Sequence, residues 1–481
     1  MKKLISLLLA VVLMLGAMGG AQGRSEASAV EPAASPAVTN NQNHWEYWTW
    51  QNWSQPVRSY LYDNGDGSVT RVEYTGSAVA VEVYDASRSI VSSRTIEPEL
   101  PLFGGFFAGS EYNFLVFGQE NPDESDEQEV VRTVKYSKSW TRLGSASLYG
   151  ENTYAPFEAA SLRAVEYGGY LVVRTGHKMY ASNGLRHQAN MTYVLNIASM
   201  QIEECCSGVV SWGGYCSHSF NQFVAVDGDK LIALDHGDAY PRCALLTRFS
   251  AAIGDSVLHS SNQRVATVAY PGSTGNNYTY SCIGGLEVTS RGYMTVGNTN
   301  GSTEASEPRN VYLTVTDRDD FTANGTRTVW LTSFTSSNTG TVSNPQLVKI
   351  TDDRLMVLWK ENGTVKYVFV DGSGELLSDI AEAPGYKVSD CLPIVIGDTV
   401  EWYVTSSSAP VFYTLSASSS LTGDVDGDGA VTMADVTLLS MYLNGEDPVI
   451  TGQGMADADA NEDGTVDIRD ISAIYAIIAA S

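Results

Sequence analysis

Two acidic runs near the C-terminus constrain the fold of this 481-residue chain most tightly. They span residues 424–435 and 459–470, and each has oxygen-bearing side chains at positions 1, 3, 5, 9 and 12 with glycine at position 6. Calcium takes about six to eight oxygen ligands, and a loop converges alternate residues on one point only if it turns sharply at the glycine. The spacing therefore predicts two EF-hand-like calcium loops rather than a pair of Asp-Gly surface turns.

The predicted ligands of two Ca²⁺ ions are side chains, except at position 7, where the backbone carbonyl would contribute. They are Asp424, Asp426, Asp428, Ala430, Thr432 and Asp435 in the first loop, and Asp459, Asn461, Asp463, Thr465, Asp467 and Asp470 in the second. An apolar run with helical spacing follows each loop, over residues 436–443 and 471–478, and predicts a helix.

The tandem repeat, over residues 421–481, resembles a type I dockerin, the module that attaches secreted enzymes and binding proteins to cohesin-bearing scaffolds such as cellulosomes. It has Asp rather than the Glu usual in EF-hands at position 12. The resemblance implies a small all-α calcium-binding domain whose partner is a cohesin module of a scaffoldin. The positions that meet cohesin in the family correspond to Met433, Ala434, Ser440 and Met441, and to Ile468, Arg469, Tyr475 and Ala476. These two sets are unlike each other, which argues against the two-way binding of dockerins with near-identical halves.

The N-terminus indicates the compartment. A basic start, an apolar run over residues 4–18 and small residues at 19–21 predict a secretory signal peptide, here residues 1–23, rather than a membrane anchor. Residues 24–43 have the composition of a linker, and no later stretch is apolar enough to span a bilayer. We expect a secreted protein, extracellular or bound to a cell-surface scaffold, with no transmembrane segment in the mature chain.

The net charge of −26 excludes one class of partner. Nucleic-acid binding needs basic patches that neutralise phosphates, and this chain has 29 basic residues against 55 acidic ones. We therefore expect no nucleic acid as a partner.

Residues 44–415 repeat a short apolar strand core, most often at intervals of roughly fifty to sixty residues. The cores are residues 79–81, 114–117, 171–173, 231–234, 293–296, 355–359 and 402–404. Short strands with tight polar turns at this period predict an all-β domain, a β-propeller of six to eight blades, with a β-sandwich pair or a β-helix as the alternative. Residues 416–420 would link it to the dockerin-like domain at 421–481.

Four tryptophans lie within residues 45–53, at the start of this domain. Two interpretations stand: aromatic faces can stack on sugar rings, or the segment packs against the propeller and closes its sheet.

Four of the six histidines lie within residues 174–242, together with arginine, tyrosine and aspartate. The candidate catalytic residues are His177, His218, Asp235, His236, Asp238, Tyr240 and Arg242. The histidines could hold an additional divalent metal; a histidine or Tyr240 could be the base of a polysaccharide lyase; or Asp235 and Asp238 could be the paired carboxylates of a glycoside hydrolase. The alternative is a polar network that ties the loops of the propeller together.

The resemblance favours one role for the propeller, because dockerin-borne domains are usually carbohydrate-active. We therefore expect a cellulosome-type component that acts in plant polysaccharide degradation on a polysaccharide substrate. The alternative is a non-catalytic carbohydrate-binding or structural propeller displayed on the scaffold.

Overall fold

The computed structural model describes residues 35–42, 56–210, 212–301, 307–417, 421–427, 430–446, 448, 450 and 452–480. Several predictions from the sequence lie outside these residues and stay predictions. They concern the signal peptide at 1–23, most of the linker at 24–43, the tryptophan-rich segment at 45–53, residues 418–420 of the second linker, and the calcium ligand Asp428.

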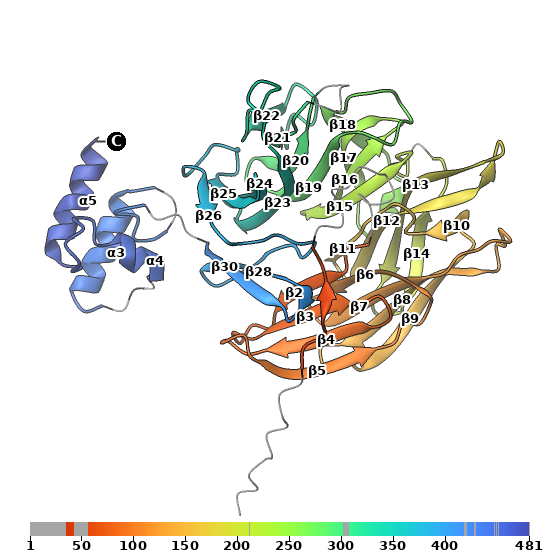
Figure 1. Ribbon diagram of the computed structural model, residues 1–481, viewed down its shortest axis with the longest axis horizontal. Coiled ribbons are helices and arrows are strands. Elements are labelled where there is room, and N and C mark those ends of the chain that lie inside the picture. The colour runs from red at the N-terminus through yellow and green to blue at the C-terminus, as the bar shows by residue number, and fades with distance from the viewer. Residues whose placement is uncertain are drawn as a thin grey trace, which may run out of the picture. The chain divides into compact units, whose positions relative to one another are not determined.

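Within the described residues, antiparallel sheets form a seven-bladed β-propeller (Figure 1). Blade 1 consists of β2 (Ser59–Asp63), β3 (Val69–Tyr74), β4 (Val79–Tyr84) and β5 (Ile90–Ile96). Blade 2 consists of β6 (Leu102–Ala108), β7 (Tyr112–Gly118), β8 (Glu129–Ser137) and β9 (Arg142–Tyr149). Blade 3 consists of β10 (Thr153–Pro156), β11 (Leu162–Tyr167), β12 (Tyr170–Ser182), β13 (Leu185–Asn196) and β14 (Gln201–Cys206).

The remaining blades follow in chain order. Blade 4 consists of β15 (Ser219–Asp227), β16 (Lys230–Asp238), β17 (Arg242–Ala252) and β18 (Asn262–Ala269), with the 3₁₀ turn η1 (Val257–His259) before its last strand. Blade 5 consists of β19 (Ser281–Val288), β20 (Gly292–Thr299), β21 (Asn310–Asp317) and β22 (Thr326–Trp330). Blade 6 consists of β23 (Val342–Thr351), β24 (Arg354–Glu361), β25 (Thr364–Val370) and β26 (Ala381–Ala383). Blade 7 consists of β27 (Ile394–Ile396), β28 (Thr399–Val404) and β30 (Val411–Ser416).

The first strands of the blades line the centre of the propeller. Strand β11 contacts β6 and β15, β19 contacts β15 and β23, and β27 contacts β23 and β2. Because these strands run side by side in one direction, the residues just before each first strand lie on one face of the propeller. The second strand of each blade is antiparallel to the first, so its end lies on that same face, which we call the entry face.

The predicted strand cores identify all seven blades, and the propeller prediction is confirmed. Six cores lie in the second strand of their blade, where β11 counts as the first strand of blade 3 and β12 as the second. Residues 79–81 lie instead in β4, the third strand of blade 1. The second strand, β3, has no apolar run because Arg71 and Glu73 interrupt it. Both side chains are buried, and the Arg71 guanidinium bonds Glu73 at 2.5 Å and Glu82 at 2.6 Å. Pairing inside the core offsets the desolvation cost of burying these charges. Because the strand contains charged residues, a hydropathy pattern does not reveal it.

The N-terminal segment closes the ring between the first and last blades. Strand β1 (Thr39–Asn40) pairs with β29 (Ser406–Ser408), which follows the second strand of blade 7. The next residue, Asn41, is fully buried. Its amide nitrogen donates to Ser59 Oγ at 3.1 Å in blade 1, and its amide oxygen accepts from Thr405 N at 2.7 Å beside blade 7. Asn41 therefore joins the two blades that the ring must bring together.

The C-terminal part of the chain contains α3 (Met433–Leu443), α4 (Gly452–Asp457) and α5 (Ile468–Ala480). Its core is small, and Val425, Val436, Leu439, Ala458 and Ile474 are its most buried members. The two predicted helices are therefore confirmed as α3 and α5. In the described residues, no helix combines the length and apolarity that a membrane span would need.

Candidate functional site

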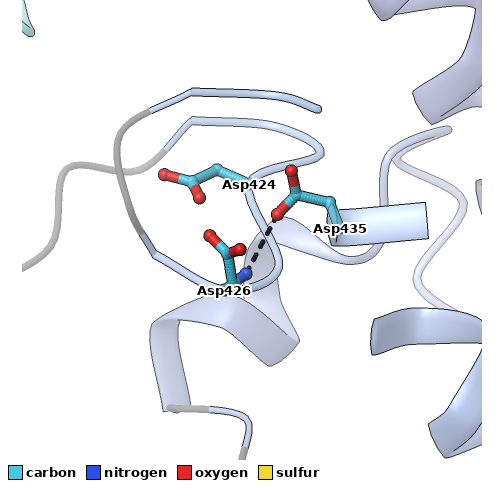
Figure 2. A group of neighbouring side chains, drawn as sticks. All are labelled: Asp424, Asp426 and Asp435. Carbon is cyan, nitrogen blue, oxygen red and sulfur yellow. Dashed lines mark hydrogen bonds between the residues drawn. The ribbon is translucent and has the colours of Figure 1, made fainter. Parts of the chain in front are cut away.

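The first acidic loop brings three carboxylates to one point (Figure 2). One oxygen from each of Asp424, Asp426 and Asp435 lies within 4.8 Å of the others. Asp424 and Asp435 are buried, and Asp426 is exposed. Like charges this close repel one another, so the arrangement favours a bound cation, and an all-oxygen donor set suits a hard ion such as Ca²⁺.

Asp435 also organises the backbone around this site. Its Oδ1 accepts hydrogen bonds from Val425 N at 2.7 Å and Asp426 N at 3.0 Å, and its Oδ2 accepts one from Thr432 N at 2.7 Å. The Thr432 side chain in turn accepts a hydrogen bond from Ala434 N at 3.1 Å. These reciprocal bonds form a capping box at the start of α3, so the last ligand of the loop is also part of the helix cap.

The second acidic loop has the same backbone pattern. Asp470 accepts from Asn461 N at 3.1 Å and Asp467 N at 2.7 Å, as Asp435 does in the first loop. Asp459 accepts from Asp463 N at 3.0 Å and from Gly464 N at 2.8 Å. The loop therefore turns at its glycine as the spacing predicts, and its ligand set fits the same cation.

The two loops differ at position 11, which is Ala434 in the first and Arg469 in the second. The Arg469 guanidinium lies 2.8 Å from an oxygen of Asp463 and 2.7 Å from one of Asp467. Both partners are predicted calcium ligands, so the second loop has a cation of the chain beside its ligands.

Most of the predicted cohesin-contacting residues lie on the surface. Those exposed are Met433, Ala434, Ile468, Arg469, Tyr475 and Ala476, whereas Ser440 and Met441 are partly buried. Three are large apolar side chains with unusual exposure: Met433 at 51 %, Ile468 at 68 % and Tyr475 at 47 %. Exposed apolar side chains of this size are typical of an interaction surface.

In the propeller, two of the candidate histidines are enclosed separately. His177 is buried in blade 3, where its Nδ1 lies 2.7 Å from Thr153 Oγ1, and burial lowers its pKa to about 4. His236 is buried in blade 4, where its Nε2 lies 2.8 Å from Thr279 Oγ1, and burial lowers its pKa to about 3. Neither side chain is placed to exchange protons with a ligand at neutral pH.

Asp235 and Arg242 are bound to other parts of the protein. Asp235 is buried and pairs with the buried Arg174 at 2.5 Å, while Ser219 Oγ donates to it at 2.8 Å. Arg242 donates to the backbone carbonyls of Pro271 at 2.6 Å and Asn276 at 2.6 Å, which fixes the connection between blades 4 and 5. Both residues thus stabilise the connections around the site.

His218 and Asp238 form the pair that meets the surface. His218 precedes β15 and Asp238 ends β16, so both lie on the entry face. The His218 side chain is 24 % exposed and Asp238 is fully buried, with His218 Nδ1 at 2.8 Å from Asp238 Oδ1. Neither Asp238 oxygen has a hydrogen bond of good geometry within the described residues, although burying such a carboxylate costs free energy. An unsatisfied buried acid beside an accessible imidazole is the pattern of a functional site.

Two further features surround this pair. His218 has a φ of 52°, a left-handed conformation that a histidine adopts only at a cost of about 1 to 2 kcal/mol. The ring of His187 lies 6.4 Å from that of His218, and Tyr240 is 75 % exposed just beyond Asp238. The structure thus brings His218 and Asp238 together from the predicted set, whereas His177, Asp235 and His236 are buried against other partners.

The predicted divalent metal in the propeller gains no support from these positions. Within the described ranges, the only group of three or more His, Cys, Asp or Glu side chains close enough to share an ion is the one in the first acidic loop.

A cavity on the entry face escaped the sequence analysis. It has a volume of about 260 Å³ and lies where blades 1, 2 and 3 meet. Its lining includes Arg58, Tyr74, Phe103, Phe157 and Glu158. No local pattern could have revealed it, because these residues come from three blades and from connections far apart in the sequence.

Comparison with known proteins identifies the C-terminal part. Residues 422–478 match the dockerin type I domain, and they are such a domain. A search of curated proteins finds no match to the chain. Dockerin domains bind calcium and dock to cohesin modules, and the carboxylate group of the first loop agrees with this.

Solved structures resemble the propeller in fold only. Polysaccharide lyase Uly1 aligns with a TM-score of 0.42 and 10 % identity, covering 82 % of this chain and 93 % of that one. A subtype N10 neuraminidase-like protein of A/little yellow-shouldered bat/Guatemala/060/2010 aligns with a TM-score of 0.39 and 8 % identity, covering 71 % and 98 %. An uncharacterised protein from Listeria monocytogenes EGD-e aligns with a TM-score of 0.37 and 10 % identity, covering 76 % and 91 %.

Proposed function

We propose that this chain, which carries a type I dockerin domain at residues 422–478, is a secreted cellulosome-type component that brings its propeller to a cohesin-bearing scaffold. The observation that carries the proposal is the convergence of Asp424, Asp426 and Asp435 in the first dockerin loop. The second loop has an equivalent ligand pattern, so we expect two calcium ions. Calcium binding would hold the starts of α3 and α5 in place and thereby order the surface that carries Met433 and Ile468.

Docking is tested by calorimetric titration of the full chain with a panel of cohesin modules, in calcium and in excess chelator. We expect tight binding to at least one module in calcium and loss of binding in chelator, because metal binding and folding are one equilibrium in so small a core. Ile468→Asp should weaken binding, whereas Val91→Asp, at an exposed apolar site on β5 of the propeller, should not. Full binding in chelator would contradict the proposal.

For the propeller, we propose a role in plant polysaccharide degradation through His218 and Asp238. An accessible imidazole held by a buried carboxylate can take a proton from a substrate and return it to a leaving group. Asp238, whose Oδ1 lies 2.8 Å from His218 Nδ1, would orient the imidazole. Paired carboxylates are a weaker basis for catalysis here, because Asp235 is already bound by Arg174.

A non-catalytic binding propeller is the second candidate. It is favoured by the burial of His177 and His236, which leaves few titratable groups accessible on this part of the entry face. A panel of plant polysaccharides separates the two roles by release of reducing ends and by absorbance of unsaturated uronates. Product formation that His218→Asn abolishes would support catalysis; binding without product on any member would support the second candidate.

A further inference from the structure

The cavity at blades 1, 2 and 3 has the chemistry of a sugar-binding site. Its volume of about 260 Å³ is near the lower end of the range for small-molecule pockets, which is appropriate for a single ring. Two of its aromatic side chains, Tyr74 and Phe103, stack on each other at 4.7 Å with their planes 12° apart. Phe103 is buried and Tyr74 is partly exposed, so the tyrosine can offer its surface to a ligand.

A third aromatic ring is placed in this cavity at a structural cost. Phe157 has a φ of 62°, in the left-handed region that side chains other than glycine avoid. Its ring fills space that Gly104 and Gly118 leave open: a Cβ would lie 2.5 Å from that ring at Gly104 and 2.6 Å from it at Gly118. The two glycines therefore fix the position of the Phe157 ring, which is buried and lines the cavity with little freedom to move.

The polar residues of the lining decide the class of ligand. Arg58, Glu120 and Glu158 supply one guanidinium and two carboxylates. Such groups bind sugar hydroxyls in pairs, while the C–H faces of the sugar pack on the aromatic rings. The excess of carboxylate, in a chain of net charge −26, opposes an anionic sugar.

The cavity is connected to the pair of His218 and Asp238 through one residue, Gln188. The side-chain amide nitrogen of Gln188 donates to the backbone carbonyl of Glu158 at 3.2 Å, and the backbone carbonyl of Gln188 accepts from His218 N at 2.8 Å. Arg58, which precedes β2, and Tyr74, which ends β3, lie on the entry face with His218. A saccharide bound in the cavity would therefore lie on the same surface as the proposed reaction site.

From these observations we infer that the cavity lined by Tyr74, Phe103, Phe157 and Glu158 binds a neutral pyranose unit of a plant polysaccharide. This inference rests on the proposed function, since it names the saccharide class that the same face would take. It needs no chemistry at His218, and it holds for a binding propeller as well as for an enzyme.

The test is calorimetric titration of the calcium-loaded full chain with neutral oligosaccharides of glucose, xylose, mannose and galactose, and with oligogalacturonate. We expect binding of at least one neutral series and none of the uronate. Tyr74→Ala and Glu158→Gln should each weaken that binding at least tenfold; Glu158→Gln keeps the size of the side chain and guards against misfolding. Tyr278→Ala, which removes an exposed aromatic ring elsewhere, should leave the affinity unchanged.

The outcomes separate this inference from the proposed function. Absence of binding by every neutral series, preference for the uronate, or unchanged affinity in both cavity variants would overturn it. Cohesin binding and product formation are measured independently, so either can fail while the saccharide titration succeeds. Loss of neutral-sugar binding in His218→Asn but not in the cavity variants would place the saccharide at the histidine and also overturn the inference.

Discussion

The imidazole of His218 and the carboxylate of Asp238 meet at 2.8 Å on the entry face, with the acid fully buried and the histidine reaching solvent. They come from different blade elements, since His218 precedes β15 and Asp238 ends β16. We expect Asp238→Asn to lower polysaccharide turnover about 100- to 1,000-fold, because the amide can still orient the imidazole but cannot stabilise its charge. Initial rates of product release on the active polysaccharide measure this.

The control for that variant is His187→Gln, which changes a neighbouring ring whose centroid lies 6.4 Å from that of His218. It should alter the rate only a few-fold. Equal losses in the two variants, or an unchanged rate in Asp238→Asn, would contradict proton transfer by His218.

Asp435→Ala should cost the first loop more calcium affinity than Asp426→Ala. Asp426 offers the ion a ligand, whereas Asp435 also receives three backbone N–H groups and completes the cap of α3. A helix cap contributes about 1 kcal/mol, so the difference should approach tenfold. Calcium titration calorimetry of the full chain measures it, and equal losses would show that the cap is not coupled to the ion.

Asn41→Ala should destabilise the propeller by about 2 to 3 kcal/mol. The change leaves the buried Thr405 N–H without its partner and removes one of the hydrogen bonds of Ser59, between blades 1 and 7. Urea unfolding followed by tryptophan fluorescence measures the loss. The neighbouring Asn40 is exposed, so Asn40→Ala is a matched control that should shift the midpoint little; similar shifts would rule out a special role for Asn41 in closure.

Acid should destabilise the propeller partly through His177. The pKa of this histidine is about 4 in the folded protein and about 6.5 when unfolded, so the unfolded state binds the extra proton between these values. Its contribution is fully present above pH 6.5 and is lost as the pH falls towards 4, by up to about 3 kcal/mol. His177→Asn, which retains a partner for Thr153, should therefore lose less thermal stability between pH 7 and 4.5 than the unmodified protein.

Another buried group changes the folding stability in the opposite direction over part of this pH range. Burial raises the pKa of Asp390 to about 6, so protonation of that carboxyl favours the folded state as the pH falls. The test is therefore the difference in melting temperature between His177→Asn and the unmodified chain at each pH. A difference that does not change with pH would contradict the assignment.

Gly104→Ala should destabilise blade 2 by about 1 to 3 kcal/mol, because the new methyl group would meet the Phe157 ring at 2.5 Å. Gly144→Ala, on the last strand of the same blade, meets only the Met200 side chain at 3.6 Å and should be tolerated. Chemical unfolding of both variants measures the contrast. If the ring is the cause, Gly104→Ala should cost less stability in a Phe157→Ala background than in the unmodified protein.

The dockerin domain and the repeat of the propeller follow directly from the sequence. A calcium loop is formed by twelve consecutive residues, so its spacing contains nearly all of its geometry. A blade buries one apolar strand core per repeat, so its period can be read along the chain. The apolar pattern did not reveal β3, where Arg71 and Glu73 pair inside the core.

The candidate reaction site could be predicted only as a region. His236 and Asp238 lie two residues apart on β16 and share one face of the strand, yet His236 bonds Thr279 and Asp238 meets His218. Which neighbour each side chain meets depends on connections between blades, and spacing along the chain does not specify these.

The sequence by itself therefore determined the calcium loops, the two helices that follow them and the propeller repeat, because each depends on residues close together in the chain. Only the tertiary structure decided that Asn41 joins blades 1 and 7, that Asp235 is bound by Arg174 while Asp238 faces His218, and that Tyr74, Phe103 and Phe157 share a cavity. These contacts join residues between 18 and 364 positions apart, and packing in three dimensions selects them.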